Sequence, residues 1–173
     1  MLTTDRLVIR AFHRDDTAAL AAYRSDPVVA RYQSWETPLS LKDAAKAVAE
    51  YAADDPDMNG WYQWAIDLNG VLIGDIGVNV HDNCMQAEIG FTLAAQYHRR
   101  GYGTEAVERI VEHLFADRRL HRISAECDAR NVASARLLRK VGFRQEGLLR
   151  RNTWTKGEWT DDMVFGLLET DPR

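Results

Sequence analysis

The sequence predicts a mixed α/β fold, and three observations carry that prediction. An Asn-Gly turn at residues 69–70 joins two apolar stretches and is typical of a β-hairpin. Residues 104–116 repeat apolar side chains with the spacing of an amphipathic helix. Strand-like and helix-like segments are interspersed along the chain. The chain has 173 residues, 46% of them hydrophobic, so we expect residues 1–173 to form a single globular domain.

In the N-terminal half we expect one strand, three helices and then three strands. The alternation at residues 6–12 places Leu7, Ile9 and Ala11 on one face of a strand. Helices are expected over residues 15–24, from Pro27 behind an Asp cap, and from Ser40 to near residue 54. The three strands are expected over residues 61–68, 71–80 and 85–93.

In the C-terminal half we expect a helix, a strand, a second helix and two final strands. The helix over residues 104–116 is followed by a strand over 121–128. Asn131 is a natural N-cap for the second helix, and Gly142 suits its C-terminal end. The last two strands begin at residue 143, turn at Lys156-Gly157 and close over 163–168, which brings the expected strands to about seven.

Composition and charge exclude several classes of protein. The net charge of −4 argues against a general nucleic-acid binder. Residues 1–90 hold 7 basic and 14 acidic side chains, whereas residues 91–173 hold 15 and 12, so an anionic ligand would favour the second half. No apolar run approaches the roughly 20 residues of a membrane helix. The N-terminus has no apolar signal-peptide core, so we expect a cytoplasmic protein with no membrane partner.

The cysteines and histidines indicate neither a disulfide framework nor a metal centre. Cys84 and Cys127 are far apart and form no CxxC pair, so we expect two buried, reduced thiols. The five histidines include no HExxH motif, and we therefore expect no catalytic metal.

Two segments have the character of anion sites. The first leads into the helix at 104–116 through Arg99, Arg100, Gly101, Tyr102, Gly103 and Thr104. Its glycines allow close backbone approach, and the first N–H groups of a helix favour a bound anion, so the segment predicts a pyrophosphate cradle. A plain tight turn would use the same glycines. The second segment contains Asn131, Ser134 and Arg136, for which simple helix capping is the alternative.

Several separated blocks together resemble the GNAT acetyltransferase superfamily, and more narrowly its RimJ/RimL-type branch. The blocks are TTDRLVIRAFHRDD (3–16), GVLIGDIGV (70–78), AEIGFTL (87–93), HRRGYGTEAV (98–107), HRISAECDARNVASARLLRKVGFRQEG (121–147) and GEWTDDMVFGLL (157–168). The resemblance implies a mostly antiparallel sheet of about seven strands flanked by helices, with a V-shaped splay between two central strands. It also implies acetyl-CoA as the donor and a primary amine as the acceptor.

The resemblance also implies roles for individual residues. The backbone of Phe91, Thr92 and Leu93 would bond the pantetheine arm as an added strand would. The amides from Arg99 to Thr104 would hold the pyrophosphate, Asn131 would contact the pantetheine region, and Arg136 and Arg139 are weaker phosphate candidates. Two positions depart from the family pattern: His98 stands where Gln or Arg is usual, and Leu138 replaces a helix tyrosine that protonates the leaving thiolate. Ser134 is the nearest substitute for that acid.

The expected reaction is direct attack of a neutral amine on the thioester within a ternary complex. Glu88 is the first candidate for the general base, and Asp161, Asp162 or water are the alternatives. Ser134 would then donate a proton to the sulfur. The aromatic residues Trp35, Trp61, Tyr62 and Trp64 would either line a cation-friendly groove with nearby acidic residues or pack in the core.

The identity of the acceptor stays open at this stage. The branch suggests the α-amine of a protein or peptide N-terminus, while polyamines and aminoglycosides fit the same chemistry. Two other classes also remain: a CoA-binding sensor without catalysis, and an interaction domain without a cofactor. A homodimer is a further option, because symmetric pairs are common.

Overall fold

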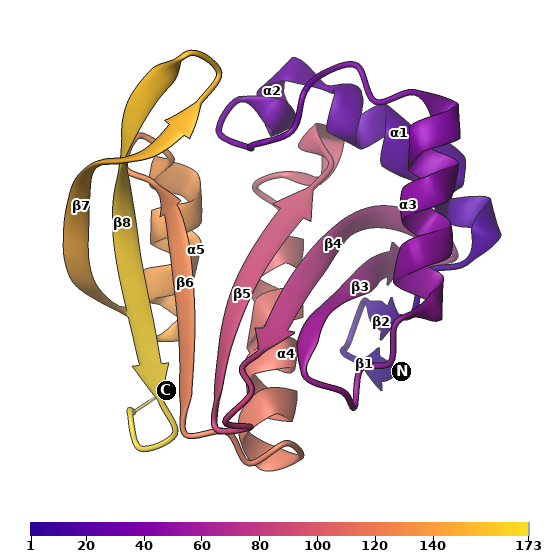
Figure 1. Ribbon diagram of the computed structural model, residues 1–173. Helices are drawn as coiled ribbons and strands as arrows, with labels where there is room; N and C mark the ends of the chain where they lie inside the picture. The colour runs from indigo at the N-terminus through magenta and orange to yellow at the C-terminus, as the bar shows by residue number, and fades with distance from the viewer. Residues whose placement is uncertain (173) are drawn as a thin grey trace.

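A computed structural model describes residues 1–172 and shows one open sheet of eight strands in the order β1-β2-β3-β4-β5-β6-β8-β7 (Figure 1). The strands are β1 (Leu2–Thr3), β2 (Val8–Arg10), β3 (Gly60–Leu68), β4 (Val71–Val80), β5 (Gln86–Leu93), β6 (Arg122–Asp128), β7 (Arg144–Thr155) and β8 (Glu158–Leu168). Neighbouring strands are antiparallel except for β5 and β6, which run parallel. The predicted mixed α/β fold with a mostly antiparallel sheet is confirmed.

Helices cover the sheet on both faces (Figure 1). They are α1 (Thr17–Ser25), α2 (Pro27–Ala30), α3 (Leu41–Ala53), α4 (Tyr102–Ala116) and α5 (Val132–Val141), with short 3-10 turns η1 (Arg14–Asp16) and η2 (Ala95–Tyr97). The larger apolar cluster joins the sheet to α4 and α5, and a second joins it to α1 and α3. No helix within residues 1–172 is long and apolar enough to cross a membrane.

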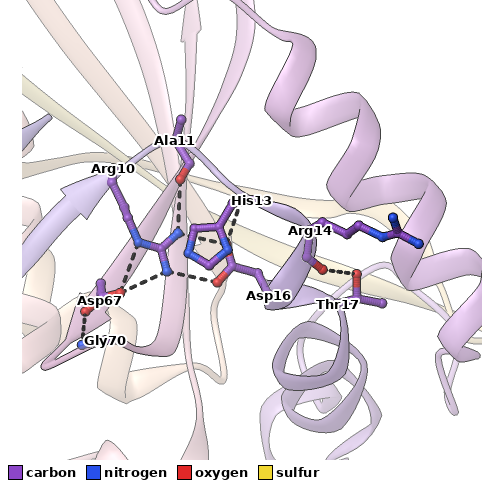
Figure 2. Close-up of polar contacts among 8 residues, drawn as sticks. All are labelled: Arg10, Ala11, His13, Arg14, Asp16, Thr17, Asp67 and Gly70. Atoms are coloured by element: carbon purple, nitrogen blue, oxygen red, sulfur yellow. Dashed lines mark hydrogen bonds and ion pairs between the residues drawn. The ribbon is translucent and has the colours of Figure 1, made fainter.

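The N-terminal strand is shorter than predicted, and an eighth strand precedes it. Strand β2 covers only Val8–Arg10, and Ala11 is exposed although the alternation placed it with Leu7 and Ile9. The Arg10 guanidinium explains the early end, because it donates to the Ala11 carbonyl and to the Asp16 carboxylate in η1 (Figure 2). The added strand β1 pairs Leu2 with Ile9 and makes the total eight rather than seven.

A buried ion cluster fastens this edge of the sheet to the first hairpin (Figure 2). Arg10 contacts Asp16 at 2.8 and 2.9 Å and Asp67 at 3.0 and 2.9 Å. Asp67 also accepts the Gly70 N–H at 2.6 Å, in the turn between β3 and β4. Burial alone would raise the pKa of Asp16, but hydrogen bonds from Arg10 and from the His13 backbone outweigh it and lower that pKa.

Most local sequence signals are confirmed by the structure. Asn69 and Gly70 adopt positive φ in the hairpin turn, and Asn131 and Gly142 cap α5 as expected. Tyr62 and Trp64 are buried in the core, in line with the packing interpretation, whereas Trp61 remains 57% exposed. The predicted burial of Cys84 is wrong: its thiol is exposed in the turn before β5, and Cys127 is partly buried.

Candidate active site

Strands β5 and β6 separate soon after they begin, as the expected splay requires. They pair only at three positions, the last of which joins Glu88 to Ser124. Beyond that point a cleft of about 90 Å³ opens between the strands. It is lined by Tyr32, Gln33, Ile89, Gly90, Phe91, Glu126, Cys127, Asp128, Asn131, Ser134 and Leu138.

The direction of the β5 backbone decides which groups face this cleft. The Met85 carbonyl accepts hydrogen bonds from His121 and Arg122 at the start of β6. Because peptide groups alternate in direction along a strand, the N–H and C=O of Phe91 and Leu93 point to the same edge. The Thr92 carbonyl instead faces β4, where it lies so close to Gly74 that a Cβ on that glycine would collide with it. Of the three residues expected to bond the pantetheine arm, Phe91 lines the cleft and the Leu93 backbone points to the same edge, whereas the Thr92 backbone points to β4.

The loop after β5 presents backbone N–H groups at the start of α4. Gly101 adopts φ +85°, a left-handed conformation that favours glycine, and α4 begins at the next residue. The Glu105 N–H donates to the Gly101 carbonyl at 3.0 Å, so the amides of Tyr102, Gly103 and Thr104 have no partner inside the helix. Gly103 also lets α4 approach α5, because a Cβ there would lie 3.0 Å from Leu137.

Side chains on both sides hold this loop in place. His98 Nε2 donates to the Leu93 carbonyl at 2.7 Å, which joins the start of the loop to the end of β5. Arg6 donates to the Arg100 carbonyl at 3.1 Å and to Glu105 at 2.7 Å, and its guanidinium stacks on Tyr102 at 4.4 Å. The side chains of Arg99 and Arg100 are exposed to solvent. The loop thus presents helix N–H groups and two guanidinium groups to an anion.

The N-terminus of α5 borders the cleft on the β6 side. Asn131 Oδ1 accepts the Ser134 N–H at 3.2 Å, which caps the helix and leaves the amide nitrogen available to a ligand. Ser134 is partly buried and lines the cleft. Arg136 is exposed and forms no ion pair with another residue among 1–172, whereas Arg139 bonds Gln145 at 2.6 Å.

Comparison with known proteins assigns this arrangement to a family. Residues 6–144 match the family model described as an acetyltransferase (GNAT) domain. The uncharacterized N-acetyltransferase YoaA of Bacillus subtilis is 32% identical over 172 residues, covering 98% of this chain and 97% of that protein. The chain belongs to the GNAT acetyltransferase family. It is therefore an acetyl-CoA-dependent N-acetyltransferase.

Two further similarities place this acetyltransferase among characterised relatives and solved structures. The [ribosomal protein uS5]-alanine N-acetyltransferase of Escherichia coli is 26% identical over 184 residues, covering 98% of this chain and 91% of that enzyme. A crystal structure of a GNAT-family acetyltransferase from Bacillus anthracis superposes with a TM-score of 0.89 at 28% identity. That superposition covers 98% of this chain and 99% of the other.

Carboxylates of the acetyltransferase gather on the sheet face opposite α4 and α5. Glu88 stands on β5 where the splay begins, and Glu126 on β6 lines the cleft itself. Burial raises the pKa of Glu126, and the nearby charges of Glu88 and Asp162 raise it further. Asp162 is buried and accepts hydrogen bonds from Asn152 and Thr153, so it is already engaged. Glu126 is not among the site residues expected from the sequence, because its only local signal is a charged residue in a half-buried strand.

The acceptor side also contains residues that no motif indicated. Tyr32 and Gln33, from the segment after α2, line the cleft opposite Asn131 and Ser134. Lys156 Nζ, in the β7–β8 turn, donates to the Ala30 carbonyl at 2.5 Å and joins the two sides of the sheet across the cleft. The four aromatic residues considered for a cation-friendly groove do not form one: Tyr62 and Trp64 contact each other in the core at 4.8 Å, Trp61 is exposed, and Trp35 stacks on Arg24 at 4.7 Å.

Proposed function

We propose that this acetyltransferase acts as a single domain and transfers the acetyl group of acetyl-CoA to the α-amine at the N-terminus of a protein or peptide. The observation that carries the proposal is the cleft between β5 and β6, which lies at the end of β5 that leads into the α4 loop and is lined by the carboxylates of Glu126 and Asp128. A donor bound along this cleft would have its diphosphate near the N–H groups of α4 and its thioester near the carboxylate of Glu126.

The donor would be held by backbone groups along one edge of the cleft. The amides of Tyr102, Gly103 and Thr104 would bind the diphosphate, aided by the positive end of the α4 dipole and by Arg99 and Arg100. An extended arm with amide groups would add to the edge of β5 at the Phe91 N–H and C=O and at the Leu93 N–H, as an extra strand does, while the Leu93 carbonyl is held by His98. Asn131 and Arg136 would contact the donor from α5.

The reaction is direct transfer rather than passage through an acetylated cysteine. The Cys127 thiol lines the cleft, but burial and the adjacent Asp128 raise its pKa to about 11, so it stays protonated near neutral pH and is a poor nucleophile. The amine nitrogen therefore attacks the thioester carbon itself. The C–N bond forms, the C–S bond breaks, and the thiolate leaves with a proton from the Ser134 hydroxyl. The nitrogen loses a proton as it becomes the amide, and that proton restores the Ser134 hydroxyl through solvent.

The attacking amine must first lose a proton, and two carboxylates are candidates to receive it. Glu126 lines the cleft, while Glu88 stands at the point where the strands separate. An α-amine has a pKa of roughly 8, so a carboxylate acting through water would deprotonate it as it binds. We favour Glu126 as the base, since it borders the space where the thioester would lie, and assign Glu88 to attraction of the cationic amine.

Two glutamine variants separate these roles. Glu126→Gln is expected to lower kcat/KM for the amine by about 100-fold and to flatten the acidic limb of the pH–rate profile. Glu88→Gln is expected to raise the KM for the amine by a few-fold and to keep that limb. Glu169→Gln, on an exposed residue next to the end of β8, serves as the matched control. The assignment of the base is wrong if Glu88→Gln flattens the limb and Glu126→Gln does not.

The similarity to the [ribosomal protein uS5]-alanine N-acetyltransferase, which covers 98% of this chain, supports an N-terminal α-amine rather than a small amine as the acceptor. The test is a thiol-release assay with acetyl-CoA and a panel of N-terminal peptides, polyamines and aminoglycosides. Acetylation of peptides in preference to the small amines supports the proposal. Turnover only with a small amine refutes the acceptor, and tight acetyl-CoA binding without turnover on any amine favours a CoA sensor.

A further inference from the structure

The glycines of the chain reveal a position that the fold itself does not explain. Five of the eleven adopt positive φ, where a side chain would be strained: Gly60, Gly70, Gly101, Gly142 and Gly157. Four more are packed so closely that a Cβ would lie within 3.0 Å of a neighbouring atom: Gly74, Gly77, Gly103 and Gly166. Gly147 stands at a register shift in β7. Gly90 alone has ordinary φ, regular pairing and no atom within 4 Å of a Cβ.

A glycine in the middle of a strand is unfavourable unless something requires it. It loses more chain entropy on folding than alanine does and gives no side chain to the sheet. Gly90 is the fifth of the eight residues of β5 and pairs with Gly77 of β4. Because no protein atom occupies the Cβ position, the space above Gly90 is open to a ligand.

The direction of that space identifies the ligand as the acceptor rather than the donor. Side chains alternate along β5, so Gly90 shares its face with Glu88, whereas Ile89 packs in the core beside α4. The proposed donor site begins at the N-terminus of α4, on the Ile89 side. Glu126 lines the cleft with Gly90, and Trp61 covers the paired Gly77, where a Cβ would lie 3.2 Å from its ring. The open space at Gly90 is thus bordered by the carboxylate of Glu126 and, on the neighbouring strand, by the ring of Trp61.

We infer that Gly90 is a specificity-determining residue, whose missing side chain leaves room for the carbon next to the attacking nitrogen and for the substituent on that carbon. This inference rests on the proposed acetyl transfer and concerns its acceptor. In an N-terminal acceptor the substituent is the side chain of the first residue. An added methyl group at position 90 would occupy the same space.

The experiment compares Gly90→Ala and Gly90→Val with the wild type. The acceptors are peptides that the wild type acetylates and that begin with Gly, Ala, Ser or Val. If the wild type accepts only small amines, amines of increasing substitution at the carbon next to nitrogen take the place of the peptides. Gly147→Ala is the control, because it also adds a methyl group to a strand glycine with open space but lies away from the cleft.

Gly90→Ala is expected to lower kcat/KM about 10-fold for acceptors with a bulky substituent and little for those beginning with Gly, with Gly90→Val lowering it further. The KM for acetyl-CoA stays at the wild-type value, and the Tm stays equal or rises, because alanine reduces the entropy of the unfolded chain. The inference is overturned if Gly90→Ala acetylates every acceptor like the wild type, if it raises the KM for acetyl-CoA instead, or if its Tm falls.

Discussion

Replacement of Arg6 by alanine tests whether the α4 loop binds a diphosphate. Glu105, in the first turn of α4, places a carboxylate beside the amides proposed to bind that anion, and Arg6 neutralises it through a hydrogen bond of 2.7 Å. Burial would raise the pKa of Glu105, but hydrogen bonds from Thr4 and Arg6 lower it, so the carboxylate remains charged at neutral pH. Without Arg6, this negative charge would repel the donor.

The size of the effect follows from the charges and their exposure. The Arg6 side chain is 44% exposed and that of Glu105 is 18% exposed, so solvent screens their interaction and only a fraction of a buried pair's energy applies. Two unit charges about 8 Å apart, at an effective dielectric constant of about 40, interact by about 1 kcal/mol. Loss of the hydrogen bond to the Arg100 carbonyl adds a similar amount. Together these correspond to a KM for acetyl-CoA raised roughly 10- to 30-fold.

Steady-state kinetics with a thiol-release readout would measure this change. We expect Arg6→Ala to raise the KM for acetyl-CoA while kcat changes less than about 2-fold, since Arg6 does not touch the cleft. Glu105→Gln breaks the same ion pair but removes the repulsive charge, so its KM should equal or fall below that of the wild type. The double variant removes the repulsion but still lacks the hydrogen bond to the Arg100 carbonyl, so its KM should lie between those of Arg6→Ala and the wild type. If Glu105→Gln raises the KM as much as Arg6→Ala does, the ion pair acts only as a brace and the electrostatic reasoning is wrong.

Two further predictions concern the leaving group and the stability of the fold. Ser134→Ala should lower kcat by about 10- to 100-fold with little change in acetyl-CoA binding, measured by calorimetry, and unchanged turnover would remove Ser134 from the mechanism. Asp16→Asn should lower the free energy of unfolding by about 2 kcal/mol at pH 7, because it removes a buried charged partner of Arg10. The pKa of Asp16 is lowered by folding, so its contribution is present above about pH 4 and is lost at lower pH. Urea unfolding at pH 7 and near pH 3 should therefore show the difference between variant and wild type shrinking with acid, and a constant difference would contradict the ionic origin.

The sequence alone predicted those features that depend on neighbouring residues. The Asn69-Gly70 turn needs positive φ at both central positions, and the Asn131 cap needs one side-chain oxygen near the third helix N–H. Both features therefore depend only on residues that are close in sequence. The left-handed Gly101 before α4 is of the same kind. The place of the proposed diphosphate site in the chain therefore follows from residues 99–104 themselves.

Features that depend on strand pairing could not be predicted in this way. Glu126 gains its place beside the cleft only because β6 separates from β5, and those strands are joined through the whole of α4. Thr92 lies between two cleft-facing residues in sequence, yet its carbonyl points toward β4, because direction alternates at every residue. Arg10 also bonds Asp67, which is 57 residues away, and no local signal in the sequence indicates that contact.

The position of the active site follows from the one parallel pair in the sheet. Strands β5 and β6 are each followed by a helix, so their carboxyl ends and the N-termini of α4 and α5 lie at the same edge. In an antiparallel pair these ends would be at opposite edges, and the amides at Tyr102 that we propose to bind the diphosphate would be separated from Asn131 and Ser134. Splaying the strands at this edge exposes backbone groups of Phe91, which require partners of their own. The proposed donor, which is anionic at one end and amide-rich along its length, would satisfy both the helix amides and the exposed strand edge.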